Sequence, residues 1–194
     1  MCSSDLGGNM SNLIIIGAGG FGLEVAAYAE DIARAGNTQL SLKGFLDDTR
    51  KTDETHAGYP ILGNTDAAID HNAVYVIAVG SCAGRKKLAE KLATKGAKFI
   101  NLFHPSAHVS ASAKIGIGTI LAPFALVGPA TQIGEQCLFN VYACAGHESR
   151  MGAYCVLSPY ASTHGQTTVD SQVFMGGQAF ITAQIKVGDG AKIA

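Results

Sequence analysis

A histidine followed by an acidic residue, His147-Glu148, comes directly after Gly146, in a context typical of a turn. An imidazole titrates near neutral pH, so it can take a proton from an attacking amine or hydroxyl as a general base. A neighbouring carboxylate can stabilise the resulting imidazolium or raise its pKa. A non-catalytic histidine in an exposed turn could occur in the same sequence context. Both interpretations of His147 therefore stay open at this point.

A glycine cluster indicates a second kind of chemistry. Gly17-Ala18-Gly19-Gly20-Phe21-Gly22 follows the apolar run Leu13–Ile16 and precedes a helical pattern over residues 23–35. Glycines at a strand-to-helix turn let the backbone approach a phosphate, and the helix amino terminus supplies amide donors. An NAD site places an acid about 20 residues after the glycines. Here Asp47-Asp48 come later, so we favour a mononucleotide or sugar nucleotide, although a plain tight turn remains possible.

The first half of the chain alternates strand and helix patterns. We expect strands at residues 42–46 and 74–79, helices at 67–70 and 85–95, and a hairpin-like segment at 58–63. This order predicts a Rossmann-like α/β domain over residues 10–103, with a parallel sheet of three or four strands.

The second half repeats every six residues. From residue 109 onward, each sixth position is apolar except Thr163, and the residue after it is often glycine. No helix keeps that register, because six is far from a multiple of 3.6. We expect a triangular prism in which three hexapeptides form one coil, and residues 18 apart stack about 4.8 Å from each other. We assign the glycines to positive-φ turn positions. The apolar positions are Val109, Ile115, Leu121, Val127, Ile133, Phe139, Ala145, Met151, Leu157, Val169, Met175, Ile181, Val187 and Ile193.

Stacking of residues 18 apart also suggests positions for other candidate residues. It places His164 one coil away from the His147 turn, either as a ligand contact or as a plain turn residue. Asn140 has the same two interpretations. Cys137 and Cys155 should stack in small inward positions, and we interpret them as core packing.

Composition excludes several classes of function. The net charge is −1, with 15% charged and 47% hydrophobic residues, which favours neither nucleic-acid nor anionic-membrane binding. The apolar runs are too short to span a bilayer. The five cysteines include no CxxC pair, so we expect no metal site and a cytoplasmic, reducing location. Residues 1–9 resemble a mistaken start, with Met10 the better one, and the prism lacks a visible cap, so we expect truncation after residue 194.

Four motifs occur together in order along the chain and carry a family resemblance. They are the glycine cluster at 17–22, Gly44-Phe45-Leu46-Asp47-Asp48, Asn101-Leu102-Phe103-His104-Pro105-Ser106-Ala107, and Gly146-His147-Glu148. Together they resemble the sugar O- and N-acetyltransferases of the NeuD/PglD type, from residue 12 to the end. The resemblance implies a left-handed parallel β-helix acetyltransferase domain over residues 104–194, acetyl-CoA as co-substrate without a metal, and a homotrimer.

The same resemblance implies roles for particular residues. His147 would be the general base and Glu148 its acidic neighbour. A nucleotide-linked amino sugar would contact Gly19, Gly20, Phe21, Asp47, Asp48, Gly80, Ser81 and Asn140, and acetyl-CoA would contact Val156, His164 and Gly177. Val156 stands where PglD-like members have a coenzyme-contacting histidine, and Ser158-Pro159-Tyr160 replaces a glycine-containing turn, so this chain departs from the family pattern at the coenzyme site.

Three alternatives remain beside N-acetylation of a nucleotide-linked amino sugar. The first is an O-acetyltransferase acting on a free sialic-acid-like sugar. The second is a non-catalytic β-helix that binds a ligand or scaffolds a complex. The third is an NAD-binding regulatory domain fused to a prism, which the late position of Asp47-Asp48 disfavours.

Overall fold

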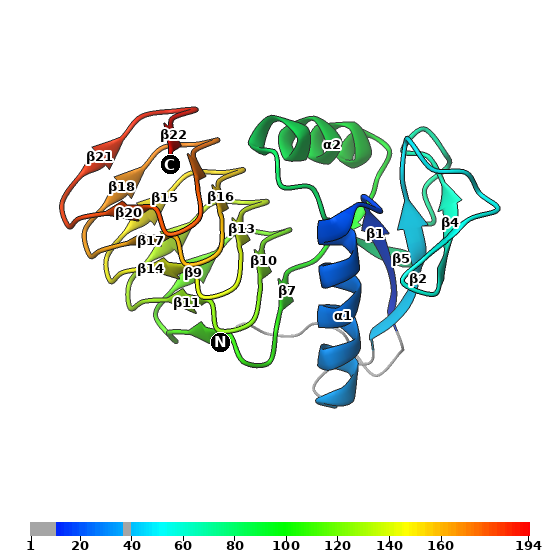
Figure 1. Ribbon diagram of the computed structural model, residues 1–194, viewed down its shortest axis with the longest axis horizontal. Helices are drawn as coiled ribbons and strands as arrows, with labels where there is room; N and C mark the ends of the chain where they lie inside the picture. The colour runs from blue at the N-terminus through cyan, green and yellow to red at the C-terminus, as the bar shows by residue number, and fades with distance from the viewer. Residues whose placement is uncertain (1–10, 37–39) are drawn as a thin grey trace. The chain divides into compact units, whose positions relative to one another are not determined.

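The computed structural model describes residues 11–36 and 40–194 (Figure 1). The chain divides into two compact units, which are taken one at a time below. One unit holds the described residues up to Val79 together with Lys87–Ile100, and the other holds Gly80–Lys86 together with Asn101–Ala194. The extension at residues 1–9 lies outside the described residues.

The first unit is built on a six-stranded sheet with the order β3-β4-β2-β1-β5-β6. All its pairs are parallel except β3 with β4, which form an antiparallel hairpin. The Rossmann-like α/β class is therefore confirmed, but the expected three or four strands were too few. The elements are β1 (Ser11–Ile16), α1 (Gly20–Arg34), β2 (Leu40–Leu46), β3 (Thr55–His56), β4 (Tyr59–Gly63), β5 (Ala73–Ile77), α2 (Cys82–Thr94) and β6 (Lys98–Phe99).

One expected element does not form. The predicted helix over residues 67–70 is replaced by a turn, in which the Asn64 side chain accepts the amides of Asp66 and Ala67 at 2.9 and 3.1 Å. This is the bonding pattern of a helix N-cap, but the chain makes a single turn there, closed by the Ala67 amide and the Asn64 carbonyl at 3.1 Å, and no helix follows.

The second unit is a three-sided prism of two-residue strands. Each strand pairs in parallel with the strand 18 residues away, as Leu121↔Phe139 and Phe139↔Leu157 illustrate. This register confirms the predicted parallel β-helix, with three hexapeptides in each coil. One sheet has six strands and two have five. The strands are β7 (Leu102–Phe103), β8 (His108–Val109), β9 (Lys114–Ile115), β10 (Ile120–Leu121), β11 (Leu126–Val127), β12 (Gln132–Ile133), β13 (Leu138–Phe139), β14 (Cys144–Ala145), β15 (Arg150–Met151), β16 (Val156–Leu157), β17 (Ser162–Thr163), β18 (Thr168–Val169), β19 (Phe174–Met175), β20 (Phe180–Ile181), β21 (Lys186–Val187) and β22 (Lys192–Ile193).

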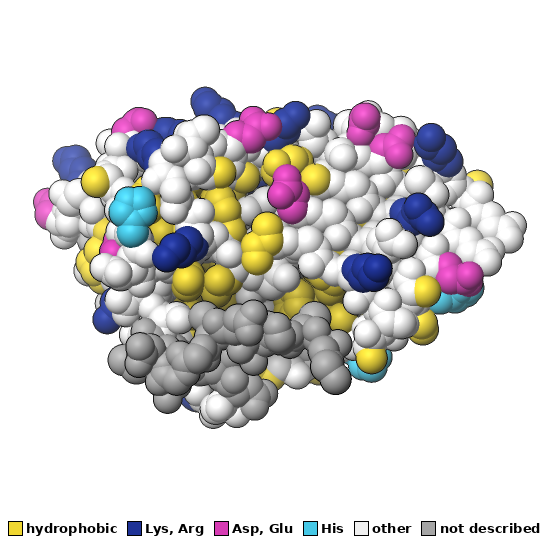
Figure 2. Space-filling view, turned by 180° about the vertical axis from the view of Figure 1, so that it is seen from behind, with side chains coloured by type: hydrophobic (Ala, Val, Ile, Leu, Met, Phe, Trp, Pro, Cys, Tyr) yellow, Lys and Arg dark blue, Asp and Glu magenta, His cyan; other side chains and the backbone are white. Residues whose placement is uncertain are grey.

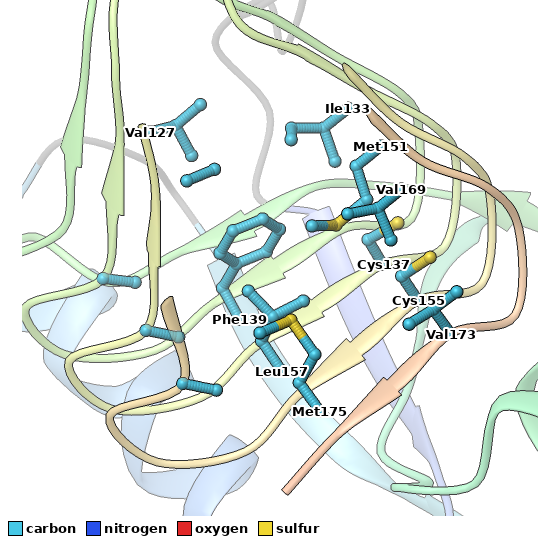
Figure 3. Close-up of a cluster of buried hydrophobic side chains, with 14 of the residues drawn as sticks. Val127, Ile133, Cys137, Phe139, Met151, Cys155, Leu157, Val169, Val173 and Met175 are labelled. Atoms are coloured by element: carbon cyan, nitrogen blue, oxygen red, sulfur yellow. The ribbon is translucent and has the colours of Figure 1, made fainter. Parts of the chain in front are cut away.

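The second residue of each strand points into the prism. Leu121, Phe139 and Leu157 are all 0% exposed, and even the polar exception Thr163 is only 1% exposed. Figure 3 shows Phe139, Leu157 and Met175 in one row, with Cys137 and Cys155 beside each other in another. Both cysteines are free and fully buried, so they serve as core packing.

The glycines of the repeat have a different purpose from the one expected. The positive-φ residue of each turn lies two positions after the glycine and is usually not glycine, as at Glu148 (φ 56°) after Gly146 and Tyr154 (φ 61°) after Gly152. A Cβ added at Gly146 would lie 2.6 Å from the Gly165 nitrogen, and one at Gly134 would lie 2.6 Å from the Ala153 nitrogen. Glycine is therefore needed there because neighbouring coils approach too closely for a side chain.

Polar side chains cap the first coil at all three corners. Higher in the prism, the positive-φ amide donates to a carbonyl of the coil below, as Glu148 does to Pro129 at 2.8 Å. At the start, the side-chain oxygens of Asn101, Ser106 and Ser112 accept amides of the second coil at 3.0, 3.2 and 3.0 Å. These bonds satisfy backbone groups that an open end would leave unpaired.

Candidate active site

His147 and Glu148 lie on a corner of the prism between β14 and β15, which we call the histidine corner (residues 146–148 with the stacked turns 128–130, 164–166 and 182–184). His147 Nδ1 is 3.0 Å from Glu148 Oε2, and the two side chains are 60% and 55% exposed. A carboxylate can only accept, so the neutral imidazole carries its proton on Nδ1. That leaves Nε2 with a lone pair, as a general base requires.

Gly165 makes room for the imidazole. A Cβ added at Gly165 would lie 2.3 Å from His147 Nε2 and 2.4 Å from Cε1, so any larger residue would displace the ring. Gly165 is buried although it sits in an exterior turn. The sequence analysis missed this residue, and its signal was the glycine 18 positions after His147.

His164 lies where the stacking rule places it, in the coil above Gly146. Its ring meets that of Phe180 edge-on, with the centroids 4.5 Å apart. His164 is therefore on the histidine corner, but its orientation is set by an aromatic contact.

Asn140 and Gly177 lie on a different corner, between β13 and β14, which we call the aromatic corner (residues 122–124, 140–142, 158–160 and 176–178). Phe124, Tyr142 and Tyr160 stack there with centroid distances of 4.9 Å. Strand β14 separates the two corners, so one chain does not bring Asn140 or Gly177 to His147.

Val156, which the resemblance assigns to coenzyme A, lies on β16. It is the outward residue of β16 but is only 2% exposed. The Cys82 thiol, at the start of α2, lies 3.5 Å from the Val173 carbonyl on the same side of the prism. The expected contact of Val156 with the coenzyme stays a prediction.

In the α/β unit, the glycines after β1 divide into two kinds. Gly17 has φ 104°, and a Cβ at Gly22 would lie 2.3 Å from the Gly17 carbonyl oxygen, so the fold itself requires both. Gly19 and Gly20 are exposed, and a Cβ at either would meet nothing within 4 Å. Packing does not require glycine at these two positions, whereas close approach of a ligand to the backbone would.

Asp47 and Asp48 shape the pocket through bonds within the chain. Asp47 accepts the Ala18 amide at 2.7 Å and the Thr49 hydroxyl at 2.7 Å, while Asp48 holds the Thr65 amide at 2.7 Å. Burial works to raise the pKa of Asp47, but the bonds from Thr49 and from the backbone amides outweigh it and hold the pKa below its ordinary value. Both acids border a cavity of about 180 Å³ at the carboxyl edge of the sheet.

Two side chains that the sequence analysis missed fix the glycine turn. Arg50 Nε donates to the Ala18 carbonyl at 3.1 Å, and His56 Nε2 donates to the Gly19 carbonyl at 3.0 Å. His56 is 8% exposed and packs edge-on against Phe45. Nothing in the local sequence marks these partners, because they reach the turn from beyond β2.

Gly80 and Ser81 border a cavity of about 570 Å³ in the prism unit, together with Cys82, Phe174 and Lys192. Arg85, which the sequence analysis also missed, ties this segment to the prism: Nε donates to the Gln136 carbonyl at 2.8 Å. Arg85 is 0% exposed, and burial lowers its pKa to about 10.

Within residues 11–36 and 40–194, the side chains of His, Cys, Asp and Glu form no group of three or more that could hold a metal ion. No helix in that same part of the chain is long and apolar enough to cross a membrane. On the face shown in Figure 2, positive and negative side chains are interspersed.

Comparison with known proteins places this architecture in a class. Residues 12–92 match the family model described as the PglD N-terminal domain. The whole chain matches the acetyltransferase domain of PglB from Neisseria gonorrhoeae FA1090, with a TM-score of 0.77, 29% identity, and 95% and 96% of the two chains covered. The same domain in complex with acetyl coenzyme A matches with a TM-score of 0.69 and 28% identity, over 95% and 96% of the two chains. The class is therefore an α/β domain of the PglD type followed by a left-handed β-helix.

A curated relative narrows the resemblance. Over 116 residues the chain is 38% identical to UDP-N-acetylbacillosamine N-acetyltransferase of Bacillus subtilis (strain 168). The match covers 58% of this chain and 51% of that protein, so the chain aligns with about half the length of the relative. These findings confirm the resemblance to the NeuD/PglD type of sugar acetyltransferase.

Proposed function

We propose that the protein transfers an acetyl group from acetyl-CoA to the amino group of a nucleotide-linked amino sugar. The observation that carries the proposal is the histidine corner, where Glu148 binds His147 Nδ1 at 3.0 Å and leaves Nε2 able to accept a proton. The names of the relatives, an N-acetyltransferase and an acetyltransferase domain with acetyl coenzyme A, support the same chemistry.

The proposed mechanism is direct transfer. The acceptor amine attacks the thioester carbonyl, and His147 Nε2 takes the proton that the nitrogen loses. Glu148 stabilises the imidazolium formed at that moment. Collapse of the tetrahedral intermediate breaks the carbon–sulfur bond, and the coenzyme thiolate takes the proton back from His147, which restores the neutral imidazole.

The proposed acceptor site lies in the α/β unit. Gly19 and Gly20 leave the backbone open at the amino terminus of α1, where amides and the helix dipole favour a phosphate. We assign the nucleotide to this turn, with Phe21, Asp47 and Asp48 as its neighbours, and the sugar side to Gly80, Ser81 and Asn140.

The proposed active form is a homotrimer. His147 and His164 lie on the histidine corner, whereas Asn140 and Gly177 lie on the aromatic corner of the same chain. A site that uses all four therefore needs a second copy, whose aromatic corner would face the histidine corner of the first. Acetyl-CoA would bind along this contact, near His164 and Gly177. We assign the protein to the cytoplasm, in keeping with the free thiols at Cys82, Cys137, Cys144 and Cys155.

The test is a screen of UDP- and GDP-linked amino sugars with acetyl-CoA, followed by release of the coenzyme thiol. His147→Ala should lower turnover at least about 100-fold, because it removes the general base. His108→Ala, at an exposed histidine on β8, should keep the wild-type rate. Equal turnover of His147→Ala and wild type would remove His147 from the mechanism. Acetylation of a free sialic acid but of no nucleotide-linked sugar would favour the O-acetyltransferase alternative.

A further inference from the structure

A column of polar side chains extends upward from Glu148 on the histidine corner. Gln184 Nε2 donates to Gln166 Oε1 at 3.0 Å, and Gln166 Nε2 donates to Glu148 Oε2 at 3.3 Å. The three residues occupy the same turn position in successive coils, with φ values of 56°, 58° and 63° from Glu148 to Gln184. The column therefore ends on the carboxylate that binds His147.

The turn itself does not require this column. The same positive-φ position on the aromatic corner holds Phe124, Tyr142 and Tyr160, at φ 60°, 59° and 62°. Backbone conformation thus accepts aromatic, amide and acidic residues alike. The turn conformation therefore does not explain why residue 166 is a glutamine, whereas its two side-chain hydrogen bonds do.

Both ends of the Gln166 amide are engaged. Its oxygen accepts from Gln184, so its nitrogen is the end that faces Glu148. The same atom, Glu148 Oε2, receives His147 Nδ1 at 3.0 Å and Gln166 Nε2 at 3.3 Å. A glutamate that is 55% exposed would otherwise sample several rotamers, and a second donor holds the carboxylate where it meets the imidazole.

We propose that Gln166 is a positioning residue for the acetyl transfer. Through Glu148, it keeps His147 in the tautomer with the proton on Nδ1, so that Nε2 stays able to accept the acceptor's proton. The proposal rests on the proposed function, since the tautomer matters only if His147 is the base. Gln184 contributes at one remove, by orienting the Gln166 amide.

The first experiment measures the tautomer directly and needs no turnover. In the full-length protein at a pH where His147 is neutral, ¹⁵N chemical shifts of the imidazole, assigned with His147→Gln, should show mainly the Nδ1–H form. Gln166→Met keeps the length of the side chain but removes the donor, and should lower the fraction of that form. Gln172→Met is the matched control, because Gln172 has φ 58° at the same turn position on the third corner of the prism (residues 116–118, 134–136, 152–154 and 170–172), away from the proposed contact between copies, and should leave the tautomer unchanged. An unchanged tautomer in Gln166→Met would overturn the proposal.

The second experiment is a double-mutant cycle in the transfer reaction. Gln166→Met should lower kcat by about 3- to 10-fold with little change in KM for either substrate, the size expected for one hydrogen bond. In a Glu148→Ala background the same change should have no further effect, because its path to His147 is gone. Gln184→Met should give a smaller loss of the same kind. Equal losses with and without Glu148 would overturn the proposal, whereas absent transfer in the wild type would contradict only the proposed function.

Discussion

At the residue scale, the orientation of the His147 ring depends on the absence of a side chain at Gly165. A Cβ at Gly165 would overlap the imidazole, at 2.3 Å from Nε2. We predict that Gly165→Ala displaces the ring and lowers kcat by about 100-fold, the cost expected when a catalytic group moves by about 1 Å. The measurement is steady-state kinetics, with circular dichroism to show that the prism still folds.

Gly188→Ala is the control for that variant. Gly188 is another turn glycine of the repeat, directly after the inward residue Val187, and a Cβ there would meet nothing within 4 Å. It should keep its activity. If both alanine variants lost activity equally, the loss would reflect the repeat and not the imidazole.

Thr163 shows a residue-scale conflict inside the prism. It occupies an inward position at 1% exposure, and within the described part of the chain its hydroxyl has no hydrogen-bond partner. A buried hydroxyl without a partner costs about 1–3 kcal/mol. We predict that Thr163→Val raises the free energy of unfolding by about 1 kcal/mol, measured by urea denaturation.

Thr131→Val should have the opposite effect and serves as the comparison. The Thr131 hydroxyl is equally buried but donates to the Gly146 carbonyl at 2.7 Å. Its loss leaves that carbonyl with one partner fewer and should destabilise the protein. If Thr131→Val also stabilised the protein, burial of any hydroxyl would explain the change in the free energy of unfolding at both positions. The missing hydrogen-bond partner of Thr163 would then not be the cause.

At the element scale, hydrogen bonds to two carbonyls fix the direction of the peptide groups in the turn between β1 and α1. In a trans peptide the C=O and N–H point in opposite directions. Because Arg50 holds the Ala18 carbonyl and His56 holds the Gly19 carbonyl, the amides of Gly19 and Gly20 are turned the other way. The turn is thus prepared to donate two amides to an anion before one binds.

This arrangement predicts a specific effect of His56. His56→Phe keeps a ring against Phe45 but loses the donor to Gly19, and should weaken UDP or GDP binding by about 10-fold, equivalent to about 1.4 kcal/mol. Isothermal titration calorimetry measures the affinity. The kcat at saturating acceptor should stay near the wild-type value. An unchanged affinity with a lowered melting temperature would show that His56 only stabilises the fold.

Elements differ in how far the sequence could predict them. The inward positions from Val109 to Ile193 follow from the six-residue period, because each must be apolar to pack in its row. The purpose of the glycines was assigned wrongly, since periodicity shows that a position is constrained but not by what. The helix expected over residues 67–70 does not form, because the turn that Asn64 closes with the Ala67 amide is not continued by further helical bonds.

At the scale of the whole molecule, the site could be predicted where its residues are neighbours in sequence or stack 18 positions apart. His147-Glu148 is visible as a pair, and their 3.0 Å contact agrees with that expectation. Arg50, His56 and Arg85 instead donate to backbone carbonyls that lie far from them in sequence. Such partners leave no side-chain pattern to find, so only the folded chain reveals them.

The aromatic corner argues for assembly at the same scale. Phe124, Tyr142 and Tyr160 form a stacked column in which each side chain stays roughly half exposed, and Leu126 and Phe180 add further exposed apolar surface nearby along the chain. Contiguous apolar surface of this kind usually marks an interface. Asn140 and Gly177 lie on this corner, one prism face away from His147.

We therefore predict that trimer formation and turnover are lost together. Tyr142→Asp places an unpaired charge in the middle of the column and should convert the proposed trimer to monomers, as sedimentation velocity would measure. Ile117→Asp is the matched control, since Ile117 is a 50% exposed apolar residue on the third corner and should leave both properties intact. Turnover should fall in proportion to the lost trimer, because the monomer keeps His147 but lacks the facing corner. A fully active Tyr142→Asp monomer would instead mean that one chain holds the complete site.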